Sequence, residues 1–222
     1  MQTAPLGESL PLPGRPWDAA GWLRRAARCY HRPPVTLTGL ARKMHWTEED
    51  YLLLEGQSPI KHEFFEGEIF ARTGAKPVHN RVAAALLGAL VACVRGGSCR
   101  AFNSDQRIHV LATGLYTYAD GGVACGRWQI HTDGMALLNP VLLYEVLSHS
   151  TAEYDRGAKL DHYRQIASLR HVLLVDVPAR SVEHHRRGDD GAWTSVVVRE
   201  GRVMLPELGG EIALDEIFLP EP

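Results

Sequence analysis

The chain has 222 residues, of which 45% are hydrophobic and 23% are charged. This balance is that of an ordinary globular protein, long enough for one domain with a sizeable core, and it excludes a disordered tail or a fibre. The formal charge of −2 gives no general attraction to polyanions, so any contact with nucleic acid has to come from a local basic surface.

The cysteine pattern and the hydropathy of the chain bear on its compartment. The four cysteines are too scattered for a paired zinc motif and too few for a disulfide scaffold, so we expect reduced thiols. No stretch approaches the roughly 20 apolar residues of a membrane span, and the N-terminus lacks the basic start and apolar run of a secretory signal. We therefore predict a soluble, cytoplasmic protein without a membrane partner.

Residues 1–43 differ from the rest of the chain because prolines interrupt every long element there. The prolines of this segment are Pro5, Pro11, Pro13, Pro16, Pro33 and Pro34. We predict a poorly ordered extension over residues 1–43 and a single folded domain over residues 44–222. Met44 stands directly before the first regular pattern and is an alternative start of the protein.

The first regular patterns predict a helix, a hairpin and a second helix. Thr47 and Asp50 form an N-terminal capping pattern for a short helix that ends at Gly56. Aromatic and aliphatic residues on both sides of Gly67 predict a hairpin. Apolar residues then recur at helical spacing over residues 78–93, which predicts a helix that packs against the core.

Strands dominate the rest of the chain. Short apolar or alternating runs predict strands at residues 100–103, 106–111, 115–123, 141–147, 172–175, 181–186 and 193–199. The simplest pairing joins the first three in an antiparallel meander and the last two in a hairpin. Ser150 and Glu153 form a capping box for a helix that runs to about Ile166, and this strand, helix, strand order implies a parallel crossover. The sequence therefore predicts one domain with a mixed α/β (α+β) fold.

Two acidic residues stand in apolar surroundings, where an unpaired charge is costly. Glu145 interrupts the apolar run 141–147, so we place a functional role ahead of a strand-end glutamate near the surface. Asp120 precedes Gly121 and Gly122, and on the sequence alone a turn aspartate is the better interpretation. A divalent cation would compensate both carboxylates, which makes a metal-dependent hydrolase the leading hypothesis.

Lys159 and Glu63 are the other candidates for such a site. Lys159 lies four residues after Asp155 on the predicted helix, so an exposed ion pair worth roughly 0.3 to 0.5 kcal/mol is a sufficient explanation for it. Because this helix begins just after the Glu145 strand, its first turns can also bring the ammonium near the carboxylates. Glu63 has apolar neighbours, with a solvated hairpin edge as the alternative. His79 is expected at the surface, and the remaining histidines show no metal-ligand spacing.

Five short motifs follow one another in an order that resembles one protein family. They are His62-Glu63-Phe64-Phe65-Glu66-Gly67-Glu68, His79-Asn80, Asp120, Glu145-Val146-Leu147-Ser148 and Asp155-Arg156-Gly157-Ala158-Lys159. In these motifs the chain resembles the Uma-two-type endonucleases, a branch of the restriction-endonuclease-like PD-(D/E)xK superfamily. The resemblance runs from about Met44 to the C-terminus.

The resemblance implies a central mixed sheet flanked by helices and a set of site residues. Asp120 matches the family's metal-binding aspartate, and Glu145 matches the first residue of the E-x-K element. Glu63 matches an N-terminal glutamate that helps to hold metal. Leu147 occupies the third place of E-x-K, so we assign the lysine role to Lys159 by the geometric argument given above.

The chain departs from the family pattern on both sides of the matching aspartate. Ala119 replaces the proline that normally precedes it, and Gly121 and Gly122 replace bulky β-branched residues. Since the acidic residues of the pattern are present and Lys159 takes the role of the lysine, we expect an intact site.

The combined hypothesis is hydrolysis of phosphodiester bonds with Mg²⁺, or with Mn²⁺ in its place, and with DNA as the expected partner. Asp120, Glu145 and Glu63 would hold the metal, and Lys159 would orient the attacking water. A homodimer would allow both strands of a duplex to be cut. One alternative is a catalytically inactive nuclease fold that binds nucleic acid or regulates, motivated by the missing E-x-K lysine. Another is a hydrolase for a phosphodiester outside nucleic acids.

Overall fold

The computed structural model of the protein describes residues 45–72 and 74–219. The predicted extension over residues 1–43 lies outside these residues and stays a prediction, as does the domain boundary at residue 44. None of the described helices combines the length and the apolar character that crossing a bilayer requires.

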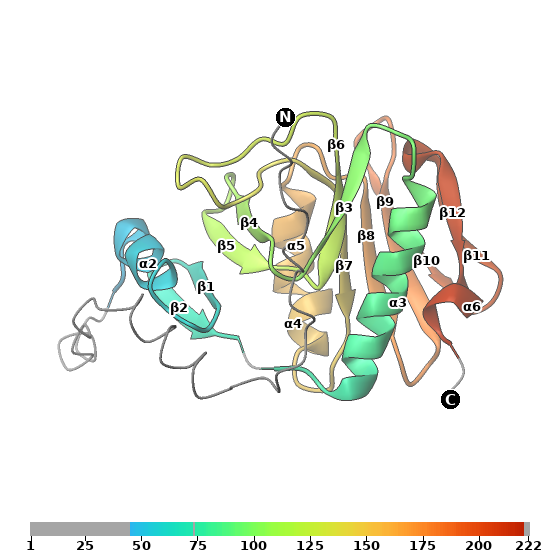
Figure 1. Ribbon diagram of the computed structural model, residues 1–222, viewed down its shortest axis with the longest axis horizontal. Coiled ribbons are helices and arrows are strands. Elements are labelled where there is room, and N and C mark those ends of the chain that lie inside the picture. The colour runs from blue at the N-terminus through green and yellow to red at the C-terminus, as the bar shows by residue number, and fades with distance from the viewer. Residues whose placement is uncertain (1–44, 73, 220–222) are drawn as a thin grey trace, which may run out of the picture. The chain divides into compact units, whose positions relative to one another are not determined.

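The largest sheet is six-stranded and mixed (Figure 1), with the strand order β10-β9-β8-β7-β6-β3. Its strands are β3 Cys99–Asn103, β6 Gly121–Cys125, β7 Pro140–Val146, β8 His171–Asp176, β9 Ser181–Arg187 and β10 Trp193–Val198. As predicted, β7 and β8 pair in parallel, and the other neighbours are antiparallel. The mixed sheet and the terminal β9-β10 hairpin expected from the sequence are therefore confirmed.

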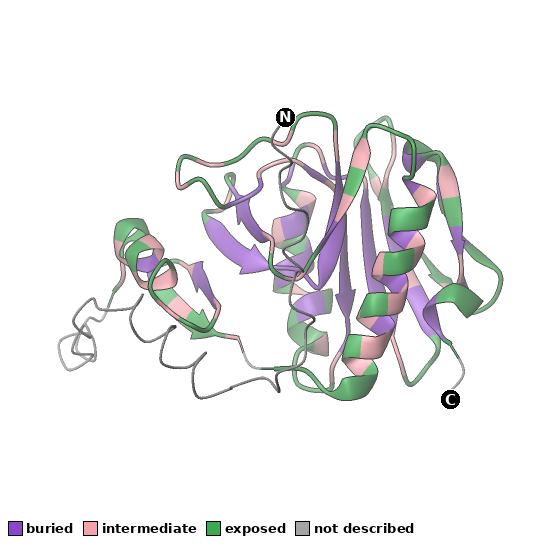
Figure 2. Ribbon diagram, viewed as in Figure 1, coloured by how far each residue is buried: buried purple, intermediate pink, exposed green. Residues whose placement is uncertain are grey.

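Other elements cover both faces of this sheet (Figure 1). One face carries the helices α3 Pro77–Cys93 and α6 Leu214–Ile217. The same face carries a hairpin of β11 Arg202–Leu205 and β12 Gly210–Ala213, with a short 3-10 helix at Pro206–Leu208 between these two strands. The other face carries α4 Ala152–Arg156 and α5 Ala158–Arg164. Val82, Leu86 and Leu90 repeat at helical spacing and bury one side of α3. Figure 2 shows the inner strands of the large sheet mostly buried and the outer side of α3 exposed, whereas the edge strands β3 and β10 are mostly exposed or half-buried.

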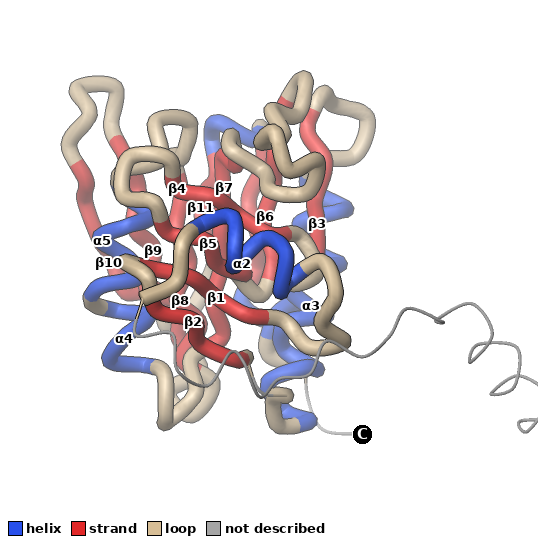
Figure 3. The backbone as a smooth tube through the Cα atoms, turned by 90° about the vertical axis from the view of Figure 1, so that its left-hand side faces the viewer, coloured by secondary structure: helices blue, strands red, loops and turns tan. Residues whose placement is uncertain are grey.

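A second sheet of four strands has the order β2-β1-β5-β4. Its strands are β1 His62–Phe65, β2 Glu68–Ala71, β4 Arg107–Val110 and β5 Leu115–Tyr118. The hairpin predicted around Gly67 joins β1 and β2, and Gly67 has the φ of 83° that a glycine adopts freely. Helix α2, Glu48–Glu55, begins with the predicted capping box of Thr47 and Asp50 and lies beside β1 (Figure 3).

The predicted continuous strand 115–123 is divided in the structure. Strand β5 ends at Tyr118 in the small sheet and β6 begins at Gly121 in the large sheet, so Ala119 and Asp120 connect the two sheets. The predicted antiparallel meander is confirmed for β4 and β5, which pair as expected, but it is wrong for β3, which pairs with β6 and not with β4. An alternating pattern indicates where strands lie, but it does not indicate the sheet to which each strand belongs.

The predicted helix 150–166 is also divided. Helices α4 and α5 meet at Gly157, and the residue before α4 is Thr151, whose side chain makes no capping hydrogen bond. The predicted capping box of Ser150 and Glu153 is therefore wrong. The break has a consequence for function, because the direction of α5 determines the position of Lys159.

The expectation of reduced thiols is wrong for two of the four cysteines. Cys99 and Cys125 form a disulfide between β3 and β6. These residues are 26 positions apart in the sequence, but they are direct partners in the register of the two antiparallel strands. Their pairing depends on which strands are neighbours, which the sequence pattern does not give. Cys93 is a free thiol.

Candidate active site

The four predicted site residues come from four different elements and lie in one buried cluster. Glu63 is on β1, Asp120 is in the link between β5 and β6, Glu145 is on β7 and Lys159 is on α5. Glu63 is 7% exposed, Asp120 is 9% exposed, and Glu145 and Lys159 are each 2% exposed. Charges buried to this degree need partners, so their contacts determine what the cluster can do.

Lys159 joins three of the acidic residues. Its Nζ lies 2.9 Å from Glu145 Oε1 and 3.7 Å from both Glu63 Oε1 and Asp155 Oδ1, and it donates to the Tyr118 carbonyl oxygen at 3.3 Å. The pairing of Lys159 with Asp155 is therefore buried rather than exposed, which corrects the expectation from their spacing. Burial alone would lower the pKa of Lys159, but the carboxylates outweigh it and hold this pKa above its ordinary value, so the amine stays protonated.

Glu145 is the most enclosed of the carboxylates. Besides Lys159 it has one further described donor, the Tyr163 hydroxyl, which lies 2.5 Å from Glu145 Oε1. Burial raises the pKa of Glu145 from 4.5 to about 7, although the Lys159 ammonium acts in the opposite direction. Glu145 therefore gains or loses its proton near neutral pH, and this step changes the net charge of the cluster.

Asp120 occupies the connecting position that its glycine neighbours predict, but its carboxylate is buried among site residues. Oδ2 accepts a hydrogen bond of 2.8 Å from the Val146 backbone N–H and lies 3.1 Å from His79 Nε2. Burial would raise the pKa of Asp120, and the contact with His79 outweighs it and lowers this pKa. The same contact raises the pKa of His79. His79 is thus a half-buried partner of the site, with 16% of its side chain exposed, and not the solvated surface residue that the sequence predicts.

Arg72 is a site residue that the sequence does not reveal. It follows β2, and its guanidinium lies 2.9 Å from Glu63 Oε1 and 3.7 Å from Asp120 Oδ1. It also donates to the Tyr118 carbonyl oxygen. An arginine after a short hairpin is typically a solvated surface residue, so only the folded structure shows that Arg72 bridges two predicted metal ligands.

Glu63 is bound from several directions. The Thr117 hydroxyl donates to its Oε1 at 2.7 Å, in addition to the contacts with Arg72 and Lys159. Burial acts to raise the pKa of Glu63, but these two cations outweigh it and lower the pKa. The carboxylate is therefore ionised at neutral pH. The alternative of a solvated hairpin edge is wrong for this residue, because β1 is buried where Glu63 lies.

The formal charges of the cluster do not balance. Four buried carboxylates, those of Glu63, Asp120, Glu145 and Asp155, face the two permanent cations Arg72 and Lys159. When all four carboxylates are ionised and His79 is neutral, two negative charges remain, which is the charge that one divalent cation would neutralise. Without such an ion, the raised pKa values of Glu145 and His79 favour protonation of these two groups, which removes the excess. Oxygen donors of this kind also suit Mg²⁺.

The geometry of the carboxylates has to change for all of them to share one ion. Among the described residues, Glu63, Asp120 and Glu145 do not bring one ligand atom each within 4.8 Å of one another. Arg72 binds Glu63 and lies near Asp120 in this structure, and Lys159 binds Glu145. A metal ion would therefore compete with the guanidinium for the carboxylates.

The two glycine departures beside Asp120 are explained by close packing. A Cβ at Gly121 would lie 2.5 Å from the Tyr144 hydroxyl oxygen. A Cβ at Gly122 would lie 2.6 Å from the Phe102 ring and would also meet the Leu142 carbonyl oxygen. Large aromatic rings thus fill the space that β-branched side chains would need. The two glycines are required by packing, and they do not indicate a loosened site.

Sequence comparison with known proteins identifies a family model and two relatives that the chain matches. The model of the family Uma2, described as "Putative restriction endonuclease", matches residues 48–215. Two Synechocystis sp. proteins are similar to the chain. "Uncharacterized protein slr1290" is 32% identical over 171 residues, which cover 77% of this chain and 90% of that protein. "Uncharacterized protein sll1609" is 34% identical over 168 residues, which cover 75% and 89%.

A solved structure shares the fold. It is the crystal structure from Anabaena variabilis described as "a putative nuclease belonging to DUF820". It superposes with a TM-score of 0.59 at 17% sequence identity and covers 76% of this chain and 97% of that chain. The sequence matches to the family model and to the two relatives show that this chain belongs to the Uma2 family.

Proposed function

We propose that this protein is a nuclease that hydrolyses phosphodiester bonds in DNA with Mg²⁺, or with Mn²⁺ in its place. One observation carries the proposal: four buried carboxylates from separate elements face only two permanent cations. The description of the family and that of the structural neighbour, both nucleases by name, support the same reaction class.

Asp120, Glu145 and Glu63 are the proposed metal ligands, in the roles that the PD-(D/E)xK pattern gives them. When bound, the metal supplies a Lewis acid for the scissile phosphate and lowers the pKa of the attacking water. The three carboxylates bring the negative charge that holds such an ion, and without it they would repel a DNA phosphate.

The two cations of the site have different proposed tasks. Lys159 stays protonated between Glu145 and Glu63, so it can orient a water molecule and offset negative charge that develops on the phosphate. Arg72 has to leave Glu63 and Asp120 when those carboxylates take up metal. A guanidinium released at this point suits a bidentate contact with a DNA phosphate.

Plasmid cleavage by the full-length chain tests the proposal. Supercoiled DNA should be nicked in Mg²⁺ or Mn²⁺ and left intact in excess chelator. Asp120→Asn and Glu145→Gln should each reduce the rate by at least roughly 100-fold, because each removes a charged ligand. The matched control is Asp161→Asn, an exposed aspartate on α5, which should cut like the wild type. Undiminished cutting by the first two variants would contradict the proposal.

A second candidate is a nuclease fold that binds DNA without cutting it. The observation in its favour is that Arg72 and Lys159 pair with carboxylates of the site and so neutralise part of their charge. It predicts salt-dependent DNA binding that is unaffected by metal and by Lys159→Ala, with no nicking. Competition between plasmid DNA and small phosphodiesters would in turn separate a DNA nuclease from a hydrolase of other phosphodiesters.

The proposal extends to assembly and compartment. A two-fold homodimer would present two active sites to the two strands of a duplex, and size-exclusion chromatography with light scattering measures it. A cytoplasmic location, as predicted from the sequence, would expose the Cys99–Cys125 disulfide to cellular reductants. The oxidation state of these cysteines in protein taken directly from cells therefore tests the compartment.

A further inference from the structure

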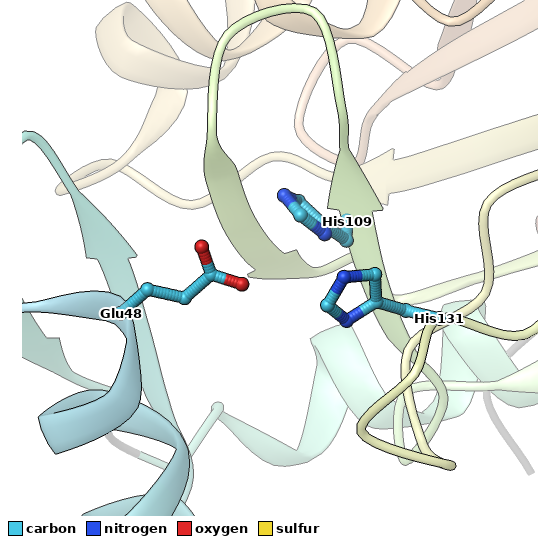
Figure 4. A group of neighbouring side chains, drawn as sticks. All are labelled: Glu48, His109 and His131. Atoms are coloured by element: carbon cyan, nitrogen blue, oxygen red, sulfur yellow. The ribbon is translucent and has the colours of Figure 1, made fainter.

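A second group of potential metal ligands lies apart from the carboxylate cluster. Glu48 is the first residue of α2, His109 is on β4, and His131 is in the loop between β6 and β7. One ligand atom from each lies within 4.8 Å of the other two. Figure 4 shows the Glu48 carboxylate and the His131 ring directed toward the space beside the His109 ring.

The packing of His109 leaves one of its ring nitrogens without a partner. The ring stacks on Tyr116 with centroids 3.8 Å apart and meets the His131 ring edge-on at 4.8 Å. His109 is 6% exposed, and its Nδ1 is buried with no hydrogen-bond partner among the residues that the structure describes. A buried polar atom without a partner is costly, and a bound ion removes that cost for the imidazole group.

The chemistry of the three side chains suits a borderline-soft divalent metal. The His109 ring is buried against Tyr116, an environment that favours the neutral imidazole with a lone pair to donate. Two imidazoles with one carboxylate form a set that zinc commonly uses, with a fourth position open to water. Because Mg²⁺ prefers oxygen donors, a set with two imidazole nitrogens binds Zn²⁺ in preference to Mg²⁺.

We propose that Glu48, His109 and His131 bind one Zn²⁺ ion, which ties α2 to β4 and to the loop before β7. Zinc to nitrogen distances of about 2.0–2.1 Å place tetrahedral ligand atoms about 3.4 Å apart. Since the ligand atoms lie within 4.8 Å of one another here, the group has to contract by at most about 1.4 Å. Glu48 is an exposed side chain on the first turn of a helix and is able to make this movement. Sequence spacing does not reveal the site because its ligands are 61 and 22 positions apart.

A hydrogen-bond network without metal is the competing explanation for the group. The Tyr116 hydroxyl donates to Glu48 Oε1 at 2.5 Å and lies 3.2 Å from His131 Nδ1. In a zinc site, the Tyr116 hydroxyl would orient Glu48 and His131 around the ion. In a metal-free network, the same hydroxyl would itself hold Glu48 and His131 together. The two cases separate on Tyr116→Phe, which removes the hydroxyl and leaves all three ligands in place.

Zinc titration of the full-length, metal-stripped protein tests the proposal. Calorimetry in excess Mg²⁺ should show one equivalent of Zn²⁺ bound with a dissociation constant below roughly 1 μM. Glu48→Gln and His131→Ala should each weaken binding by at least roughly 10-fold. The matched control Glu49→Gln changes the neighbouring exposed glutamate of α2 and should leave the affinity unchanged. Tyr116→Phe should retain the single equivalent, and Zn²⁺ should raise the melting temperature of the wild type.

The same titration on the Asp120→Asn, Glu145→Gln double variant separates this site from the proposed nuclease site. One equivalent should still bind, because neither residue belongs to the histidine group. The proposal is overturned if the wild type binds no zinc at concentrations roughly 100-fold above the expected dissociation constant. It is also overturned if the double variant no longer binds one equivalent of zinc while Glu48→Gln still does. Glu48 is exposed, so its variant folds and gives a result even if a histidine variant does not.

Discussion

Replacing Lys159 by methionine tests the ion pair at the centre of the carboxylate cluster. Lys159 Nζ lies 2.9 Å from Glu145 Oε1, and both side chains are only 3% exposed. Methionine keeps most of the aliphatic volume and removes the ammonium, so Glu145 stays buried without its nearest cation. Breaking a buried pair by removing one partner typically costs about 3–5 kcal/mol. We expect a loss of this size in the free energy of unfolding when Glu145 is ionised.

The loss should grow with pH. The pKa of Glu145 is raised by burial to about 7, and it rises further when the Lys159 ammonium is removed. A carboxyl group with a higher pKa in the folded than in the unfolded chain is protonated in the fold at low pH, and ionisation penalises the fold as the pH rises. Below pH 7, Glu145 is mostly protonated in both proteins, so the difference between them is smaller and comes from the contact of Lys159 with the ionised Glu63. Above it, the difference grows by ~1.36 kcal/mol per pH unit, which gives roughly 3 kcal/mol by pH 9.

Urea unfolding at pH 5.5, 7 and 9, followed by tryptophan fluorescence and circular dichroism, measures this difference. The matched control is Lys61→Met, which breaks an exposed pair with Asp105. It should cost at most about 1 kcal/mol. Lys61 lowers the pKa of Asp105, so that contribution is lost only at acid pH and the control should not change between pH 7 and 9. An equal loss for Lys159→Met at pH 5.5 and 9 would refute the reasoning.

Two further predictions concern packing and the crosslink of the large sheet. Gly122→Ala should lower the free energy of unfolding by about 1–3 kcal/mol, because the new methyl group overpacks the site. Gly88→Ala should raise the free energy of unfolding by about 0.5–1 kcal/mol, because its new methyl group meets open space on a helix. Equal effects of the two variants in chemical denaturation would contradict the packing argument. Reduction should expose two additional thiols per chain from Cys99 and Cys125 and lower stability by about 2–4 kcal/mol, and an unchanged thiol titration would rule out the bond.

The elements that the sequence predicts well are those whose pattern reflects local contacts. The helix expected over residues 78–93 is α3, because its apolar spacing is the spacing of the side that it buries. The hairpin around Gly67 follows from a backbone conformation that glycine adopts readily. The run 141–147 is β7, an almost wholly buried strand with an uninterrupted apolar pattern except at Glu145. In each case the neighbouring residues in sequence carry the information.

The parts that escape prediction depend on contacts between distant segments. Arg72 and His79 meet Asp120 from two other elements, and neither has an unusual local sequence. The Cys99–Cys125 bond requires β3 and β6 to be neighbours, and a single sequence does not specify strand order. For Lys159 the sequence allows either an exposed ion pair or a place near the carboxylates, and its pattern does not predict the break at Gly157 that orients α5.

The position of Asp120 shows why the two sheets and the site depend on one another. Its backbone N–H donates to the Tyr144 carbonyl oxygen, and its carboxylate accepts from the Val146 N–H, so Asp120 holds the strand on both sides of Glu145. Truncation to alanine would leave a buried N–H without a partner, which costs about 1–3 kcal/mol, and would also displace Glu145. Asparagine retains an acceptor for Val146 and removes only the charge. A loss of cleavage in Asp120→Asn with stability retained therefore reports on the charge of the site, whereas the same loss in an alanine variant would not separate charge from position.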